Sequence, residues 1–277
     1  MSASHWLIVN PASGSYSAEA VADLRGALAG AGTAVDRTIA CDRGLPTRAE
    51  VEAGGVRLVS VFAGDGTVNS VATALEGWSG ALLVLPGGTA NLLAGALHGD
   101  VDAPTIAARL PELVRLRRGC IRYTGGTALA EILAGPGATW SDVREELRDA
   151  GVAGLAGKTV AALRDSTAGP LVRLADPALG RADGYAGIRL AVAGQAMEVE
   201  GYGAQTIGDY LRQGLALLRR NFRDGPHDEL GFHRAVACRS AGDDPMALMV
   251  DGERREGRAE ERFSLAPFAL DLLGTAP

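Results

Sequence analysis

The sequence predicts an α/β domain in which helices cover a parallel sheet, followed by a second, mainly β domain. Over roughly the first 119 residues, apolar runs of strand length alternate with helical patterns, which is typical of a parallel sheet with crossover helices. From residue 120 onward, strand-like segments dominate. The apolar stretch 263–273 predicts a strand that returns to the first domain. We therefore place the first domain at 1–119, completed by 265–277, and the second at 120–264.

The elements of the first domain follow from its apolar pattern. Continuous apolar runs indicate strands that are buried on both faces, and apolar residues on one helical face indicate packed helices. Strands are expected at 6–9, 34–39, 58–62, 81–85 and 113–117, and helices at 17–29, at 47–53, after residue 67 and after residue 91.

The second domain has shorter segments, with strands expected at 128–133, 160–163, 171–174, 187–193, 196–199, 235–238 and 246–250. A helix is expected at 141–150, where Thr139 and Asp142 have capping-box spacing. A further amphipathic helix is expected at 206–222, with arginines beside its apolar face. The preferred interpretation is an ordinary helix packed on the β domain, and the alternative is contact of its basic edge with an anionic membrane.

Composition restricts the class of protein. The 277 residues are 47% hydrophobic and 22% charged, as in soluble globular proteins. A net charge of −6 argues against nucleic acid as the main partner. The cysteines are odd in number and far apart, which indicates reduced thiols and a cytoplasmic location. We find no signal peptide and no apolar run near the ~20 residues of a membrane helix, so we expect any membrane contact to be peripheral.

Polar, glycine-containing loops follow three of the expected strands, at 10–15, 64–69 and 87–91. In parallel sheets, ligands bind beyond the carboxyl ends of the strands. Glycines on both sides of Asp65 allow close backbone approach, and the helix that begins near Thr67 offers unpaired N–H groups to an anion. The pattern predicts a phosphate site that contains one carboxylate. Asp65 repels phosphate, so we expect it to hold magnesium or to orient a hydroxyl.

A second acidic element, Asp251-Gly252-Glu253, follows the strand expected at 246–250. Asp-Gly at a strand end is a hairpin signal, and this is the preferred interpretation of the dipeptide alone. Alternatively, Asp251 and Glu253 reach the phosphate loops of the other domain. Phosphoryl transfer requires phosphate loops, magnesium and a carboxylate that accepts the proton of the attacking hydroxyl. These two carboxylates and Asp65 would supply that set.

Four motifs in order, at 10–14, 64–69, 85–91 and 251–253, resemble those of the diacylglycerol kinase catalytic-domain family. This family includes bacterial soluble lipid kinases and sphingosine kinases. The Gly-Asp-Gly-Thr element alone is shared with NAD kinases and phosphofructokinases. The resemblance, which runs over most of the chain, implies a nucleotide-binding α/β domain and a sandwich-like lipid-substrate domain.

The resemblance also implies an activity, namely ATP- and Mg²⁺-dependent transfer of the γ-phosphate to the hydroxyl of a diacylglycerol-like or sphingoid-like lipid, as in phospholipid biosynthesis. Glu253 would accept the hydroxyl proton, while Asp65 and Asp251 would arrange magnesium and phosphates. A structural magnesium ion would be bound by the Asp228 side chain with Gly225 and Leu230. The residues implied in ATP binding are Asn10, Pro11, Ala12, Ser13, Gly14, Thr38, Ala63, Gly64, Asp65, Gly66, Thr67, Val68, Asn69, Gly88, Thr89 and Asn91.

The sequence departs from the family pattern in three places. After Asn91 it continues with Leu92-Leu93, where many relatives carry Asp-Phe. Ala63 stands where the family has glycine, which is acceptable if its φ is negative. The segment 131–135 lacks the usual Asn-Gly motif, so the identity of the lipid is not predicted, and neither is the oligomeric state. Two alternatives stay open: an NAD kinase-like kinase of a soluble substrate, and a non-catalytic relative that binds nucleotide or lipid.

Overall fold

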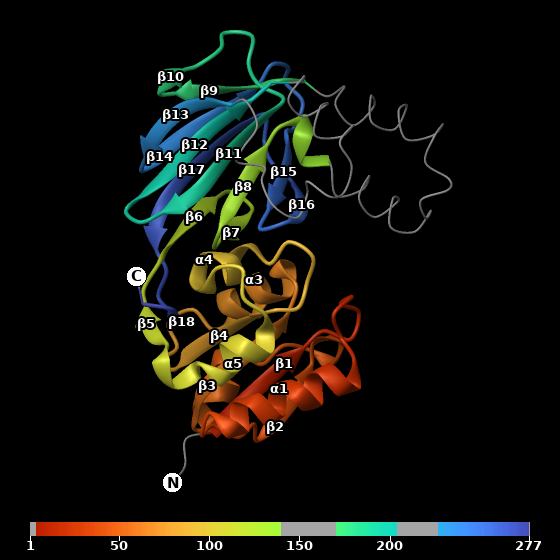
Figure 1. Ribbon diagram of the computed structural model, residues 1–277. Helices are drawn as coiled ribbons and strands as arrows, with labels where there is room; N and C mark the ends of the chain where they lie inside the picture. The colour runs from red at the N-terminus through yellow and green to blue at the C-terminus, as the bar shows by residue number, and fades with distance from the viewer. Residues whose placement is uncertain (1–3, 140–169, 204–226, 277) are drawn as a thin grey trace, which may run out of the picture. The chain divides into compact units, whose positions relative to one another are not determined.

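The computed structural model of the chain describes residues 4–139, 170–203 and 227–276 (Figure 1). It divides into two compact units, Met1–Arg118 with Pro267–Pro277, and Gly119–Ala266. The helices expected at 141–150 and 206–222 and the strand expected at 160–163 lie outside the described residues. None of the helices in the described part is long and apolar enough to cross a bilayer.

The first unit contains a six-stranded sheet in the order β2-β1-β3-β4-β18-β5. Strands β2, β1, β3, β4 and β18 pair in parallel, and only β5 at the edge runs antiparallel to its neighbour β18. The strands are β1 (Ser4–Val9), β2 (Arg37–Ala40), β3 (Val56–Ala63), β4 (Ala81–Pro86), β5 (Val114–Leu116) and β18 (Asp271–Gly274). The helices are α1 (Ala18–Gly30), α2 (Arg48–Ala53), α3 (Asp65–Ala74), α4 (Leu92–His98) and α5 (Ala103–Ala108), with 3₁₀ turns at Cys41–Arg43 and Leu110–Glu112. The predicted α/β class is confirmed.

Local sequence explains where these elements begin and what they bury. The Ser17 hydroxyl accepts the Ala20 N–H at the start of α1, and Thr47 with Glu50 forms a capping box on α2, satisfying N–H groups that a helix leaves unpaired. Leu24 and Leu28 of α1 are fully buried against the strands. The continuous apolar runs are therefore the middle layer, covered by helices (Figure 1).

The second unit consists of two mainly antiparallel sheets in the described residues, ordered β10-β9-β14-β17-β6-β7 and β13-β12-β11-β8-β15-β16. The first contains β6 (Gly119–Tyr123), β7 (Gly126–Ala128), β9 (Val172–Asp176), β10 (Ala178–Leu179), β14 (Ala235–Ser240) and β17 (Glu260–Pro267). The second contains β8 (Glu131–Ala134), β11 (Gly187–Ala193), β12 (Ala196–Tyr202), β13 (Asp228–His233), β15 (Ala247–Val250) and β16 (Glu253–Glu256), with a 3₁₀ turn at Pro136–Thr139. Apolar residues of both sheets share one core, as in a β-sandwich.

Two expected strands differ from the structure. The apolar stretch 263–273 is not one strand, because it contributes to β17 of the second unit and, after a break, to β18 of the first. Asp271 begins β18 and is fixed there by ion pairs with Arg115 and Arg117. The expected strand 128–133 is also divided, into β7 and β8. Helix α5 and strands β6, β10, β13 and β16 were not predicted.

Candidate active site

The three glycine-containing loops of the first unit meet at one edge of its sheet. The Asn10 side-chain amide donates to the Thr67 hydroxyl oxygen at 3.2 Å, which joins the loop after β1 to the first turn of α3, directly after β3. The Ser13 hydroxyl donates to the Gly87 carbonyl oxygen, which joins the loop after β1 to the loop after β4. Topology thus brings together polar groups that lie up to 77 residues apart in the sequence (Asn10 to Gly87).

Backbone packing between two of these loops leaves no room for side chains. A Cβ atom on Gly88 would lie 2.5 Å from the Gly64 Cα, and one on Gly87 would lie 2.7 Å from the Ala63 nitrogen. Glycine is therefore required at both positions, because real Cβ contacts are essentially never this short. Ala63 itself is not among the residues with positive φ, so alanine fits where the family has glycine.

Helix α3 begins at this edge. Its N-cap, Gly64, has no side chain that could accept a first-turn N–H, and such a helix end favours an anion. Asp65, the first residue of α3, bonds a different helix: its Oδ1 accepts the Leu93 N–H of α4 at 3.3 Å. The N-cap of α4, Asn91, has a left-handed conformation and bonds the Gly88 main chain instead. Asp65 therefore caps a helix other than its own and couples two of the loops.

The remaining residues implied in ATP binding differ in what they can offer. Val68 is buried in the core, so only its main chain could face a ligand. The Ala12 N–H donates to the Asn10 side chain at 3.0 Å, which shapes the first loop. Thr38 lies within edge strand β2, where its hydroxyl accepts from Arg25 at 2.7 Å. The contacts that join the loops do not involve Thr38.

In the second unit, the acidic element forms the turn between β15 and β16. Asp251 has φ 45° and Gly252 has φ 80°, as a type I′ turn requires. The predicted hairpin is confirmed. Glu253, the first residue of β16, is exposed.

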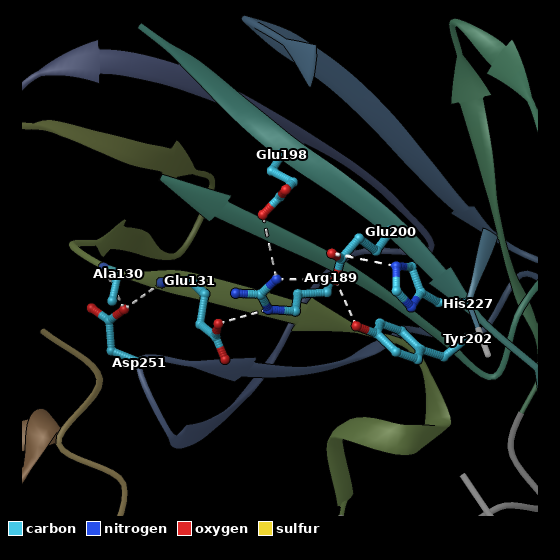
Figure 2. A network of polar contacts seen from close by, with 8 residues as sticks. All are labelled: Ala130, Glu131, Arg189, Glu198, Glu200, Tyr202, His227 and Asp251. Carbon is cyan, nitrogen blue, oxygen red and sulfur yellow. Dashed lines mark hydrogen bonds and ion pairs between the residues drawn. The ribbon is translucent and has the colours of Figure 1, made fainter. Parts of the chain in front are cut away.

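Asp251 serves as an anchor for this turn (Figure 2). Its side chain is only 2% exposed, and its carboxylate accepts the N–H groups of Leu129, Ala130 and Glu131 at 2.7, 2.9 and 3.0 Å. The Asp251 N–H also donates to the Glu131 carbonyl oxygen at 3.0 Å. Both carboxylate oxygens accept main-chain N–H groups, which gives Asp251 a structural role in this turn. The same bonds interrupt the strand expected at 128–133.

A buried network of charged side chains extends from this anchor (Figure 2). Arg189, on β11, donates to Glu131 at 2.8 Å and to Glu200 at 3.0 Å. The Tyr202 hydroxyl donates to the same Glu200 oxygen at 2.5 Å. Burial works to raise the pKa of Glu200, but the bonds from Tyr202 and Arg189 outweigh it and hold that pKa below its ordinary value. Glu131 is thus fixed through its main chain by Asp251 and through its side chain by Arg189.

Sequence reasoning missed this network. The available signal was charged residues inside apolar strands, as in Gly187–Ala193 and Ala196–Tyr202.

Two of the residues implied as ligands of a structural magnesium ion are already bound within the protein. The Asp228 carboxylate accepts from Arg181 and Tyr185, and the Leu230 carbonyl oxygen lies 2.8 Å from the His233 Nε2. Gly225 lies outside the described residues. Among the described residues, no group of three or more His, Cys, Asp or Glu side chains is arranged to hold a metal ion. As they stand, these residues do not fit a cation.

The described residues thus form an α/β unit with three interlocked glycine-containing loops and a second unit that is an antiparallel β-sandwich. Residues 4–117 match the family model of the diacylglycerol kinase catalytic domain. This match, which covers most of the first unit, confirms the resemblance.

Solved structures have a similar fold. One is a diacylglycerol kinase from Bacillus anthracis str. Sterne, 14% identical with a TM-score of 0.62, over 98% of this chain and 96% of that chain. Two further structures from that organism are each 17% identical, with TM-scores of 0.63 and 0.61, over 98% and 97% of this chain and 96% of theirs. These likenesses establish the fold. Comparison of the sequence with curated proteins gives no significant match.

Proposed function

We propose that this protein is an ATP- and Mg²⁺-dependent kinase that transfers the γ-phosphate to a lipid hydroxyl. The observation that carries the proposal is the interlocking of three loops beside the N-terminus of α3. Main-chain N–H groups and small polar side chains suit a nucleotide's phosphates. The diacylglycerol kinase catalytic domain at 4–117 supports the same activity.

ATP would lie against the loops 10–14, 63–69 and 88–91. Magnesium bound with ATP would neutralise the charge of the phosphates. Asp65 fixes the relative position of two loops through its bond to α4. The small side chains and bare main chain of this edge let phosphates approach closely.

Glu253 is proposed as the general base that accepts the proton of the lipid hydroxyl. It is exposed, so its carboxylate is accessible to a substrate, and it follows a turn fixed by buried hydrogen bonds. General bases act best when held rigidly. Asp251, Glu131 and Arg189 are positioning residues in this proposal, because they hold the segment that carries Glu253.

The second unit is proposed as the lipid-substrate domain, and the protein is proposed to work in the cytoplasm with peripheral membrane contact. The Gly-Asp-Gly-Thr element is shared with kinases of soluble substrates. The main alternative function is therefore an NAD kinase-like kinase of a soluble substrate.

A radiolabel assay tests the proposed function. The purified chain, Mg²⁺ and ATP labelled at the γ-phosphate are incubated with diacylglycerol, a sphingoid base, NAD or no acceptor. We expect label in the organic phase, only when both lipid and magnesium are present. Label on NAD alone would instead identify a kinase of a soluble substrate. Nucleotide binding without transfer to any acceptor would identify a non-catalytic relative.

A further inference from the structure

An ion pair between Arg181 and Asp228 lies at the start of β13. Arg181 binds the Asp228 carboxylate with two parallel bonds, Nε to Oδ2 at 2.8 Å and Nη2 to Oδ1 at 3.2 Å. The Tyr185 hydroxyl donates to Oδ2 at 2.9 Å. A planar guanidinium matches a carboxylate in this two-pronged way, and such pairs are among the stronger charge-assisted bonds. The bond from Arg181 is the main reason that the pKa of Asp228 lies below its ordinary value.

Tyr185 holds Arg181 in place from a second side. The Arg181 N–H donates to the Tyr185 hydroxyl oxygen at 3.1 Å, and the guanidinium lies 5.5 Å from the centroid of the Tyr185 ring. The ring itself is fully buried and lies against two glycines. A Cβ atom on Gly180 would lie 2.3 Å from the Tyr185 hydroxyl, and one on Gly201 would lie 2.4 Å from its ring. The tyrosine that orients the guanidinium therefore has little freedom to move.

The Leu230 carbonyl oxygen, also implied as a magnesium ligand, already has a hydrogen-bond partner in the protein. The His233 ring lies within hydrogen-bond distance of the Leu230 oxygen, on the strand that Asp228 begins. Magnesium requires near-octahedral oxygen ligands at about 2.0–2.1 Å. An ion on Asp228 would have to displace Arg181, since the guanidinium covers both carboxylate oxygens.

We propose that Arg181 replaces a structural cation at Asp228, so that the second unit of this chain folds and stays folded without magnesium at that position. The guanidinium supplies the positive charge, and its bonds connect the segment after β10 to the start of β13. This inference concerns the stability of the second unit and does not depend on the proposed kinase activity. Any magnesium requirement of the reaction would then come from the magnesium–ATP complex.

Thermal unfolding without nucleotide tests this proposal. The wild type, Arg181→Ala and Arg181→Ala/Asp228→Asn are melted in EDTA and in millimolar Mg²⁺ at matched ionic strength. We expect the wild-type Tm to be the same in both buffers. In EDTA, Arg181→Ala should melt roughly 2–4 °C lower, since a partly exposed pair contributes modestly. Magnesium should restore part of that loss, because Asp228 then becomes available, and Asp228→Asn should remove the restoration.

Two controls separate this effect from general loss of charge. Arg173→Ala removes an exposed arginine of strand β9 and should leave the protein insensitive to magnesium. Arg181→Lys keeps the charge, loses the two-pronged geometry, and serves as the folded variant if Arg181→Ala does not fold. It too should be insensitive to magnesium. A saturable rise of the wild-type Tm with Mg²⁺ that Asp228→Asn abolishes would overturn the proposal. The proposal would also be overturned if Arg181→Ala folds and its Tm does not change with magnesium. Neither readout involves catalysis, so failure here is distinct from failure of the kinase assignment.

Discussion

Replacing Glu253 with glutamine is expected to lower kcat for phosphate transfer by about 10²–10⁴-fold, the usual contribution of a general base. Glutamine has the same shape but cannot accept the proton of the attacking hydroxyl. Because Glu253 is exposed at the start of β16, the substitution should leave the fold intact. Nucleotide affinity should also stay unchanged, because the proposed ATP loops belong to the first unit. Steady-state kinetics and a nucleotide titration measure the two quantities separately.

The same strand offers a matched control. Glu256 lies at the other end of β16 and is likewise exposed, so Glu256→Gln removes the same charge away from the turn. This variant should keep wild-type kcat. If Glu253→Gln transferred phosphate at the full rate, Glu253 would not be the base.

Replacing Asp251 with alanine is expected to lower the free energy of unfolding of the second unit by roughly 3 kcal/mol or more. The change leaves three main-chain N–H groups in a buried site without their acceptor, and an unsatisfied buried donor costs about 1–3 kcal/mol. Alanine at φ 45° adds backbone strain. Activity should fall as well, because the turn before Glu253 loses its anchor. Urea unfolding, followed in parallel with kcat, measures both effects.

Two further variants locate the cause. Asp251→Asn keeps a residue that tolerates a left-handed conformation but loses one acceptor oxygen, so it should be destabilised less, by about 1–3 kcal/mol. Asp243→Ala removes an exposed aspartate and should have a negligible effect. Equal stability of Asp251→Ala and the wild type would show that the buried hydrogen bonds do not hold the turn.

Features that depend on short stretches of sequence, namely the buried strands, the parallel sheet and the Asp251 turn, were predictable from the sequence. The continuous apolar runs at 6–9 and 81–85 indicated strands buried on both faces, and their alternation with helices indicated a parallel sheet. Convergence of Asn10, Thr67 and Gly87 then follows, because carboxyl ends of neighbouring parallel strands share an edge. The turn at Asp251 was predictable because Asp-Gly tolerates positive φ.

Contacts between residues far apart in the chain could not be predicted from the sequence. Arg189 meets Glu131 because β11 pairs with β8, 58 residues earlier, and nothing near either residue specifies this pairing. The motif around Asp65 suggests a magnesium ligand, and nothing in it indicates that an Asp65 oxygen also reaches a helix that begins 27 residues later. Asp228 likewise meets Arg181 across 47 residues. Motifs suggest roles for Asp65 and Asp228, and the structure adds which protein groups bond their carboxylates.

The central claim, that the three loops of the first unit bind the phosphates of ATP, is tested most directly by a nucleotide titration followed through backbone amide chemical shifts. We expect saturable shifts at Gly64, Gly66, Gly88 and Thr89. In Gly88→Ala, where the added Cβ would lie 2.5 Å from the Gly64 Cα, affinity should fall by at least about tenfold, or ~1.4 kcal/mol. Saturable shifts confined to other residues, with unchanged affinity in Gly88→Ala, would contradict the claim.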